Sequence, residues 1–189
     1  MSTPEGTEPR GRLTYADYAS LPDDGRRYQL VEGELVVMAS PNTRHQLIVG
    51  EIYHRLRLHV DAARIGRVMV APLDVILDDH NVLQPDVLFV STERRGVVVP
   101  QNLRGAPDLC VEVLSPGTER LDRVRKLELY ARFGVSHYWI VDLDARAIEE
   151  YLREGEVFRV RSVTSFDDAF RPALFPSFEL CLSAVALPE

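Results

Sequence analysis

Two short apolar segments of the chain each contain an acidic residue where a buried β-strand is expected. The first, "VLQPDVLFV" (82–90), contains Asp86, and the second, "PDLCVEVLSP" (107–116), contains Glu112 between Val111 and Val113. An ionised carboxylate in such surroundings loses several kcal/mol of hydration unless a cation or hydrogen-bond donors replace the water. Any fold that this chain adopts must therefore supply partners for both acids.

The segments around these strands alternate between strand and helix periodicity. We expect helices at 43–64 and 117–134, the second with Thr118 as its N-cap and Gly134 as its C-cap, a short helix at 13–22 and a loop at 91–106. The expected strands are a hairpin at 28–38 turning at Glu32-Gly33, then 66–79, 84–90, 107–116, 136–142, 147–154, 156–163 and an edge strand within 170–185. This order predicts an α/β fold with a mixed central sheet flanked by helices, an N-terminal hairpin and C-terminal strands.

The composition limits where the protein works and what it binds. At 189 residues the chain fits one domain, which we place at 13–189 after a flexible polar tail at 1–12. No apolar run reaches the ~20 residues that span a bilayer, so no membrane association is expected. The two cysteines form no disulfide or zinc pattern, and a cytoplasmic location is the simplest interpretation. The net charge of −7 argues against a protein held on nucleic acid by bulk electrostatics.

Asp86 and Glu112 lie in successive apolar strands, and such strands often pair as neighbours. Pairing would bring the two carboxylates within reach of one divalent cation, and Mg²⁺ needs only one or two carboxylates because it retains water. Water polarised by such a cation is a nucleophile for phosphodiester hydrolysis. The alternative is a structural acid bonded to backbone amides or to an arginine, which suits Asp86 as well as a metal site does. Apolar neighbours on both sides make that alternative harder to apply to Glu112.

Lys126 is the third candidate, on the helix that follows the Glu112 strand. It lies near the margin of the apolar stripe, from which its ammonium group could stabilise developing phosphorane charge and orient the attacking water. The alternative is a surface ion pair with Asp122, four residues earlier, and spacing alone favours it because exposed pairs of this kind are common. The same helix carries four arginines, which with Lys126 form the only basic patch that we would expect to meet phosphate, and the alternative, favoured for most of it, is a solvated face of mixed charge.

Several segments together resemble a known family. They are "YQLVEGELVVM", "RHQ" opening a helix, "PLDV", "QPDVLFV", "APDLCVEVLSP" and "RKLELYARFGVSHYWIVD", followed by a closing hairpin. In this order they resemble the Uma-type restriction endonuclease family of the PD-(D/E)xK nuclease superfamily, from about residue 13 to about residue 182. The most specific piece is "VEVLSP" followed by Lys, Tyr, Gly-Val and Trp. The resemblance implies a restriction-endonuclease-like fold and a nuclease activity.

The resemblance also implies roles for particular residues. The superfamily's metal-binding Asp falls on Asp86 and its strand Glu on Glu112, and these would hold Mg²⁺ or Mn²⁺. In most of the superfamily a lysine follows this Glu by two residues, but Leu114 stands there in this chain. The family resemblance implies that the lysine is displaced onto the next helix, where it is Lys126.

One position departs from the family pattern. Related proteins often have an acid where Gln29 stands, and that acid is thought to assist the metal site. If Glu32-Gly33 is a two-residue turn, Val31 pairs with Glu34. Cross-strand partners share a face, so Glu34 looks toward the same side as Gln29. Glu34 is therefore the candidate auxiliary acid, whereas Glu32 is expected to be solvated in the turn.

Five other residues are weaker candidates. His45, at the start of the long helix, could contact substrate, although a capping or surface role fits equally well. Asp74 is a reserve metal ligand. Asp108 shares a face with Glu112 but stands ~13 Å away in an extended strand, so it is expected to be structural. Tyr138 and Trp139 are expected in the core or at an interface rather than as a platform for stacked bases.

The sequence thus predicts a metal-dependent endonuclease acting on nucleic acid, with DNA as the expected substrate, through Asp86, Glu112, Lys126 and Glu34. The resemblance also implies a homodimer, because superfamily members frequently act as dimers. A rival hypothesis is a catalytically degenerate, non-enzymatic interaction module on the same fold, which the net charge of −7 and Gln29 favour. A third hypothesis is a hydrolase that uses paired carboxylates on sugars, which would remain active in excess chelator.

Overall fold

A mixed six-stranded sheet forms the centre of the molecule. The computed structural model describes residues 11–115, 117, 119–183 and 185. In spatial order the strands of this sheet are β11 (Val157–Ser165), β10 (Ala147–Glu154), β9 (His137–Asp142), β8 (Leu109–Val113), β6 (Val87–Ser91) and β3 (Gly66–Val70). All neighbours are antiparallel except β8 and β9, which are parallel because a helical connection joins them. The expected mixed sheet is therefore confirmed.

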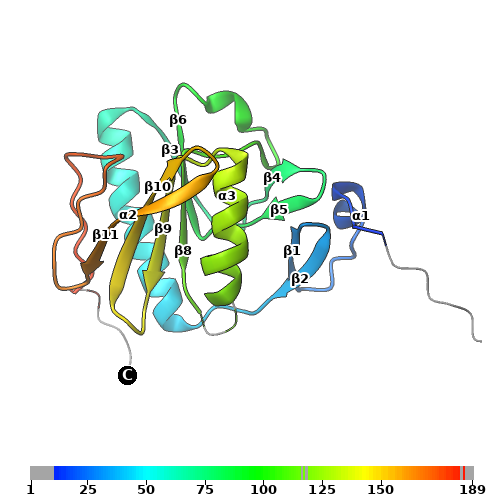
Figure 1. The fold of residues 1–189 in the computed structure, drawn as a ribbon, viewed down its shortest axis with the longest axis horizontal. Helices are drawn as coiled ribbons and strands as arrows, with labels where there is room; N and C mark the ends of the chain where they lie inside the picture. Colours follow the sequence, from blue (N-terminus) through cyan, green and yellow to red (C-terminus); the bar gives the residue numbers. More distant parts are fainter. Residues whose placement is uncertain (1–10, 116, 118, 184, 186–189) are drawn as a thin grey trace, which may run out of the picture.

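Helices cover both faces of this sheet (Figure 1). Helix α2 (Thr43–Ala63) buries an apolar stripe against the strand residues of one face, Val111 among them. Helix α3 (Leu127–Phe133) continues from a π-helical turn, η2 (Leu121–Lys126), and packs on the other face against Cys110 and Ile140. Because side chains alternate along a strand, β8 directs Cys110 and Glu112 toward η2 and α3.

A smaller five-stranded sheet lies beside the central one. Its spatial order is β2 (Glu34–Met38), β1 (Arg27–Val31), β5 (Asn81–Leu83), β4 (Val75–Asp78) and β7 (Leu103–Arg104). The expected hairpin register is confirmed, with Val31 opposite Glu34. Glu32 and Gly33 both have positive φ, as a tight two-residue hairpin turn requires. Helix α1 (Tyr15–Ala19) packs its tyrosines against this sheet and is capped by Thr14.

Three of the expected elements differ in the structure. The expected strand at 66–79 is two strands, β3 and β4, that belong to different sheets, and the break between them contains Pro72, which cannot donate a ladder hydrogen bond. The expected strand at 84–90 is confirmed as β6, which begins after Pro85 and leaves Asp86 one residue before its first residue. The expected loop at 91–106 contains the short helix η1 (Arg95–Val97) and the strand β7.

The C-terminal segment is the third difference. In place of the expected edge strand within 170–185, its described residues form one isolated bridge between Phe170 and Leu180. The segment contains two further prolines and contributes phenylalanine and leucine side chains to the core on the α2 side. β11 is the edge strand instead, and Figure 1 shows the C-terminal segment beside it.

Two expectations concern residues whose structure is not described, the tail at 1–10 and the N-cap Thr118. The other expected cap is confirmed, because Gly134 ends α3 with φ of 92°. None of the described helices is both long enough and apolar enough to cross a membrane.

Candidate active site

Asp86 and Glu112 meet where β6 and β8 lie side by side. The strands pair antiparallel with Val87 opposite Val111, so continuing this register by one residue sets Asp86 opposite Glu112. Both side chains line one cavity of about 170 Å³. The expected pairing of the two strands is confirmed, and it directs both carboxylates to the same small volume.

Asp86 has one oxygen bound by protein and one that is not. Its Oδ2 accepts a hydrogen bond from the Val113 amide at 2.8 Å and lies 3.2 Å from Nε2 of His45. Among the described residues, none forms a hydrogen bond or ion pair with Oδ1. His45 is buried at the start of α2, where Asn42 caps its backbone amide at 2.9 Å. The imidazole thus orients Asp86 rather than lying on the surface.

Glu112 also has one oxygen bound by protein and one that is not, and its side chain is more deeply buried than that of Asp86. Its Oε1 lies 2.9 Å from Nζ of Lys126 and accepts a hydrogen bond from the Tyr130 hydroxyl at 2.9 Å. Both contacts use the same oxygen, and no described residue bonds to Oε2. Desolvation is the largest cause that raises the pKa of Glu112, to about 8; Lys126 opposes this rise, and the nearby acids Asp122 and Asp86 add to it. A cation at Oε2 would favour the ionised carboxylate.

Lys126 is enclosed between two carboxylates. Its Nζ lies 2.8 Å from Asp122 Oδ1 as well as 2.9 Å from Glu112 Oε1, and its side chain is 1% exposed. Burial alone would lower the pKa of Lys126, but Asp122 and Glu112 outweigh burial and raise it. The expected ion pair with Asp122 is present, yet it is buried beside the cavity instead of lying on the surface. Lys126 therefore remains an ammonium ion at this cavity.

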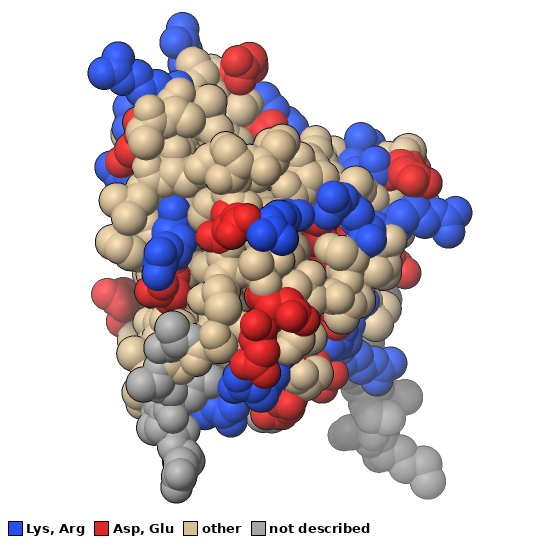
Figure 2. Space-filling view, turned by 90° about the vertical axis from the view of Figure 1, so that its left-hand side faces the viewer, with Lys and Arg blue, Asp and Glu red and all other residues tan. Residues whose placement is uncertain are grey.

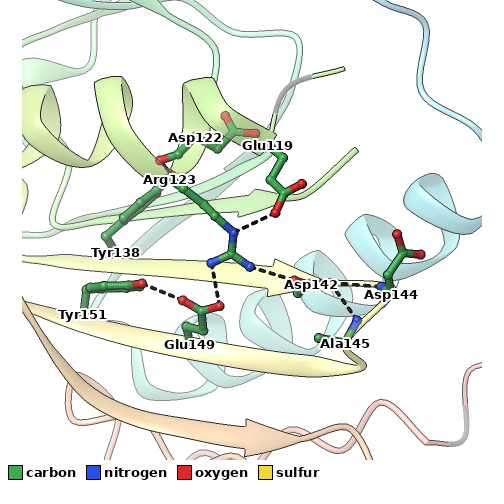
Figure 3. A network of polar contacts seen from close by, with 9 residues as sticks. All are labelled: Glu119, Asp122, Arg123, Tyr138, Asp142, Asp144, Ala145, Glu149 and Tyr151. Carbon is green, nitrogen blue, oxygen red and sulfur yellow. Dashed lines mark hydrogen bonds and ion pairs between the residues drawn. The ribbon is translucent and has the colours of Figure 1, made fainter. Parts of the chain in front are cut away.

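The π-helical turn η2 directs side chains both to the cavity and to the central sheet. Asp122 and Lys126 are buried. Arg123 instead binds acids of other elements (Figure 3). The Arg123 guanidinium lies 2.6 Å from Asp142 Oδ2 and 2.7 Å from Glu149 Oε1, on β9 and β10. These ion pairs tie the turn to the central sheet, and π-turns are frequent at functional sites.

Two glutamine side chains complete the cavity wall. Gln29 is 2% exposed, and its Oε1 is buried without a hydrogen-bond partner among the described residues. Gln84 donates from Nε2 to Asp74 Oδ1 at 2.8 Å, and its own Oε1 likewise has no described partner. A carboxylate can only accept, so the Asp74 contact fixes which end of the Gln84 amide faces it. The cavity therefore contains amide oxygens that still require donors or a cation.

Glu34 is not brought to this cavity. Its side chain is 70% exposed, and Oε2 lies 2.8 Å from the guanidinium of Arg125. The hairpin register is as expected, but the turn end of the hairpin extends past the cavity, while Gln29 lies over it. Glu32, in the turn itself, lies 3.3 Å from Arg125.

The remaining sequence candidates have structural contacts. Asp108 Oδ2 accepts a hydrogen bond from the Ser91 amide at 2.7 Å, as expected for a structural acid. Tyr138 and Trp139 are fully buried in the core. Asp74 contacts Gln84 but does not line the cavity itself, so it lies behind the part of the cavity wall that Gln84 forms.

Sequence reasoning did not give a cavity role to Asp122 or Gln84. One feature of the sequence would have strengthened the prediction that Lys126 belongs to the site. It is the only lysine in the chain, and the other 21 of the 22 basic residues are arginine. Lysine at this one position indicates that a compact ammonium group is needed there, because arginine is larger and planar.

The oxygen atoms at the cavity fit a hard divalent cation. Asp86 Oδ1, Glu112 Oε2 and Gln29 Oε1 are oxygens without described protein partners. Within the described residues there is no group of three His, Cys, Asp or Glu side chains that could hold a metal ion. Mg²⁺ takes one or two carboxylates and keeps several waters, so this oxygen set suits it better than it suits zinc, which needs more protein ligands.

Comparisons with known proteins identify a family and a similar fold. The family model described as "Uma2: Putative restriction endonuclease" matches residues 15–185. The fold is similar to a crystal structure of a "putative nuclease belonging to DUF820" from Anabaena variabilis, with a TM-score of 0.74 and 20% sequence identity, covering 92% of this chain and 97% of that one. No curated protein matches the sequence. The fold similarity extends over nearly the whole chain.

Proposed function

The chain belongs to the Uma2 family, whose model is described as "Putative restriction endonuclease", and on that premise we propose that it is a metal-dependent endonuclease that hydrolyses DNA at the cavity of Asp86 and Glu112. The observation that carries the proposal is the state of these two carboxylates. Each uses one oxygen for the protein and presents another that no described residue binds. Two such oxygens on paired strands are what a shared Mg²⁺ or Mn²⁺ ion requires.

The protein's own residues hold and orient the reacting groups. Asp86 and Glu112 would bind the cation, with Gln29 supplying an amide oxygen. When bound, the cation supplies a Lewis acid for a phosphoryl oxygen and an acidified water. His45 and the Val113 amide fix Asp86 by holding Oδ2, so that Oδ1 keeps its direction. A preorganised ligand costs little reorganisation during the reaction.

Lys126 would stabilise the negative charge that develops on the phosphate. Its ammonium group stays in place because Asp122 holds it, even when Glu112 turns its charge toward a cation. The low exposure of this group strengthens its field, since little water screens it. Tyr130 keeps Glu112 Oε1 in position through its hydroxyl hydrogen bond.

The test is plasmid cleavage in Mn²⁺ by the wild type and by Glu112→Gln, purified identically, with an excess-chelator control. We expect nicking that is lost both in the variant and in chelator. Isothermal titration calorimetry on the same samples should give Mn²⁺ binding to the wild type that the variant lacks. Equal nicking by both proteins would contradict the proposed site.

Two other outcomes would identify the rival functions. Absence of cleavage together with absence of Mn²⁺ binding would indicate a non-catalytic interaction module on the same fold. Hydrolysis that persists in excess chelator would indicate metal-independent carboxylate chemistry of the kind used on sugars. The dimer implied by the family resemblance is tested on the same preparation by analytical ultracentrifugation.

A further inference from the structure

Two further grooves adjoin the catalytic cavity and share lining residues with it. The first, of about 470 Å³, lies between β2 and η2 and shares Met38, Ala39 and Gly117 with the cavity. We call it the hairpin groove. The second, of about 560 Å³, lies beside the turn after β9 and shares Asn42 and Ser115. We call it the acidic groove. Each of these grooves offers a path along which a polymer bound at the cavity can continue.

The acidic groove is unfavourable for a polyanion. Glu119, Asp142 and Asp144 line it, and the one arginine that lines it, Arg44, lies 3.9 Å from Asp144. Nearby Arg123 is already engaged by Glu119 and Asp142 (Figure 3). The carboxylates there therefore have their cations close by, and no arginine lining this groove is available to a phosphate.

The hairpin groove has the opposite charge balance. Arg120 lines it and forms no ion pair with any described residue, and Arg125 beside it is held by acids of the hairpin, Glu34 among them. Where this groove meets the cavity, Arg27 donates to the Ala39 carbonyl at 3.1 Å and likewise has no acidic partner among the described residues. Two arginines without carboxylate partners thus follow one path from the cavity.

This placement matters because the molecule as a whole is acidic. In a chain of net charge −7, 11 of the 20 described arginines form ion pairs with acids, and Figure 2 shows Lys and Arg interspersed with Asp and Glu on the face that it draws. Phosphate recognition must then depend on local arginines and not on a broad basic surface.

The floor of the hairpin groove is apolar and open. Val37 on β2 and Val124 on η2 are 55% and 48% exposed, although both are large aliphatic side chains. A sugar or a base face would cover them, whereas a phosphate would not. The groove therefore offers a charged contact and an apolar contact next to each other.

We propose that the nucleic-acid strand next to the scissile phosphate runs through the hairpin groove, with a phosphate on Arg120 and the adjoining sugar and base against Val37 and Val124. The opposite strand direction, over the acidic groove, is disfavoured by charge. This proposal rests on the proposed nuclease function, because it assumes that the substrate is a nucleic acid held at the catalytic cavity.

The test compares Arg120→Glu with Arg67→Glu. Arg67 is an exposed arginine of β3 that also lacks an ion pair with described residues, and it pairs with Val90, at the far end of β6 from Asp86. The two variants change net charge equally, so any difference between them reports position. We expect Arg120→Glu to raise KM for DNA about tenfold with kcat unchanged, and Arg67→Glu to have little effect.

Binding is measured separately from cleavage, by fluorescence anisotropy of a labelled oligonucleotide in the Glu112→Gln background. The magnitude of the salt slope should fall by about 0.9 for Arg120→Glu on duplex DNA, or about 0.7 on a single strand, because one phosphate contact is lost. Val124→Asp should weaken binding without a comparable loss in Val163→Asp, a similarly exposed valine on β11.

The outcomes separate this proposal from the nuclease proposal. Wild-type cleavage with equal effects of Arg120→Glu and Arg67→Glu would overturn the groove assignment and leave the nuclease intact. Tighter binding after Asp144→Asn, together with no loss after Arg120→Glu, would place the strand in the acidic groove instead, because removing a carboxylate there relieves its repulsion of phosphate. A wild type that neither binds nor cleaves nucleic acid would overturn both proposals.

Discussion

Glu112 and Glu150 are both glutamates inside strands of the central sheet, and both are almost fully buried, at 3% and 0% exposure. Glu150 Oε2 lies 2.6 Å from Arg161, and its Oε1 accepts a hydrogen bond from the Ala173 amide at 2.7 Å. Both of its oxygens are satisfied by protein. Glu112 uses only Oε1, and its Oε2 has no described partner. Burial alone therefore does not distinguish these two acids; the oxygen of Glu112 without a described partner does.

The cations that accompany these two acids differ as well. Arg161 has a side chain that is 42% exposed, so its pair with Glu150 closes the surface over the sheet edge. Lys126 is 1% exposed and shares its charge with Asp122. A buried acid that joins two parts of the chain needs one partner for each oxygen, whereas an acid that binds a ligand must keep one oxygen free.

The largest expected effect is on catalysis and separates the two glutamates directly. Glu112→Gln should lower Mn²⁺-dependent DNA cleavage about 10²–10³-fold, because a neutral amide is a poor ligand for a hard cation. Glu150→Gln should retain the wild-type rate per folded molecule. Initial rates of plasmid nicking, normalised to the folded fraction from circular dichroism, check both. Equal losses of cleavage rate in the two variants would mean that Glu112 has no catalytic role that Glu150 lacks.

The free energy of unfolding should depend more on Glu150 than on Glu112, the reverse of the order expected for catalysis. Glu150→Ala leaves the Ala173 amide and the Arg161 guanidinium without their acceptor and should lower the free energy of unfolding by about 1–3 kcal/mol. Glu112→Gln should cost less in metal-free buffer, because it removes a charge that burial disfavours. Urea unfolding in chelator measures both, and a larger loss for Glu112→Gln would make that glutamate primarily structural.

Gln29→Glu tests whether the cavity accepts a third acid. The buried Gln29 Oε1 has no partner among the described residues. Affinity for Mn²⁺ should rise about tenfold, since ligand charge count sets the affinity of oxygen sites. Calorimetry gives the dissociation constant, with Gln46→Glu on the exposed face of α2 as the charge-matched control. An equal gain in the control would attribute the effect to net charge.

Asp122→Asn should reduce kcat about tenfold while leaving KM unchanged, because Lys126 loses the partner that holds it when Glu112 binds a cation. Lys126 is the only lysine, so lysine labelled with ¹³C at the ε-carbon gives a single side-chain signal for NMR. In the wild type this signal should stay sharp on addition of Mg²⁺, and in Asp122→Asn it should broaden. Glu119→Gln, an exposed acid of the same region, is the control.

The smallest effect concerns pH. Because the pKa of Glu112 is raised from 4.5 to about 8, the folded protein keeps a proton between these values that the unfolded chain has released. The contribution of this group to the free energy of unfolding therefore falls as the pH rises through that window. Mn²⁺ must displace the proton, so the rise in Tm caused by Mn²⁺ should be larger at about pH 8 than at about pH 6. Glu112→Gln should remove this difference in differential scanning fluorimetry.

Much of the candidate site follows from local sequence pattern. The pairing of the strands that carry Asp86 and Glu112, and the hairpin register around Glu32-Gly33, are confirmed by the structure. These features depend on side-chain alternation and turn chemistry, which act between residues close in sequence. The position of Glu34 could not be predicted in this way. The hairpin register determines which face of the sheet Glu34 lies on, but not how far the hairpin extends past the cavity.

The sequence by itself determined the two long helical segments and the strands of the central sheet, the two acids in or beside apolar strands and the presence of one lysine on the following helix. Only the tertiary structure decided which oxygen of each acid faces the cavity, that Gln29 and not Glu34 lies over it, and that Asp122 is buried with Lys126. The physical reason is range. Periodicity and turn residues fix each element locally, whereas burial and free oxygens depend on contacts between elements far apart in the chain.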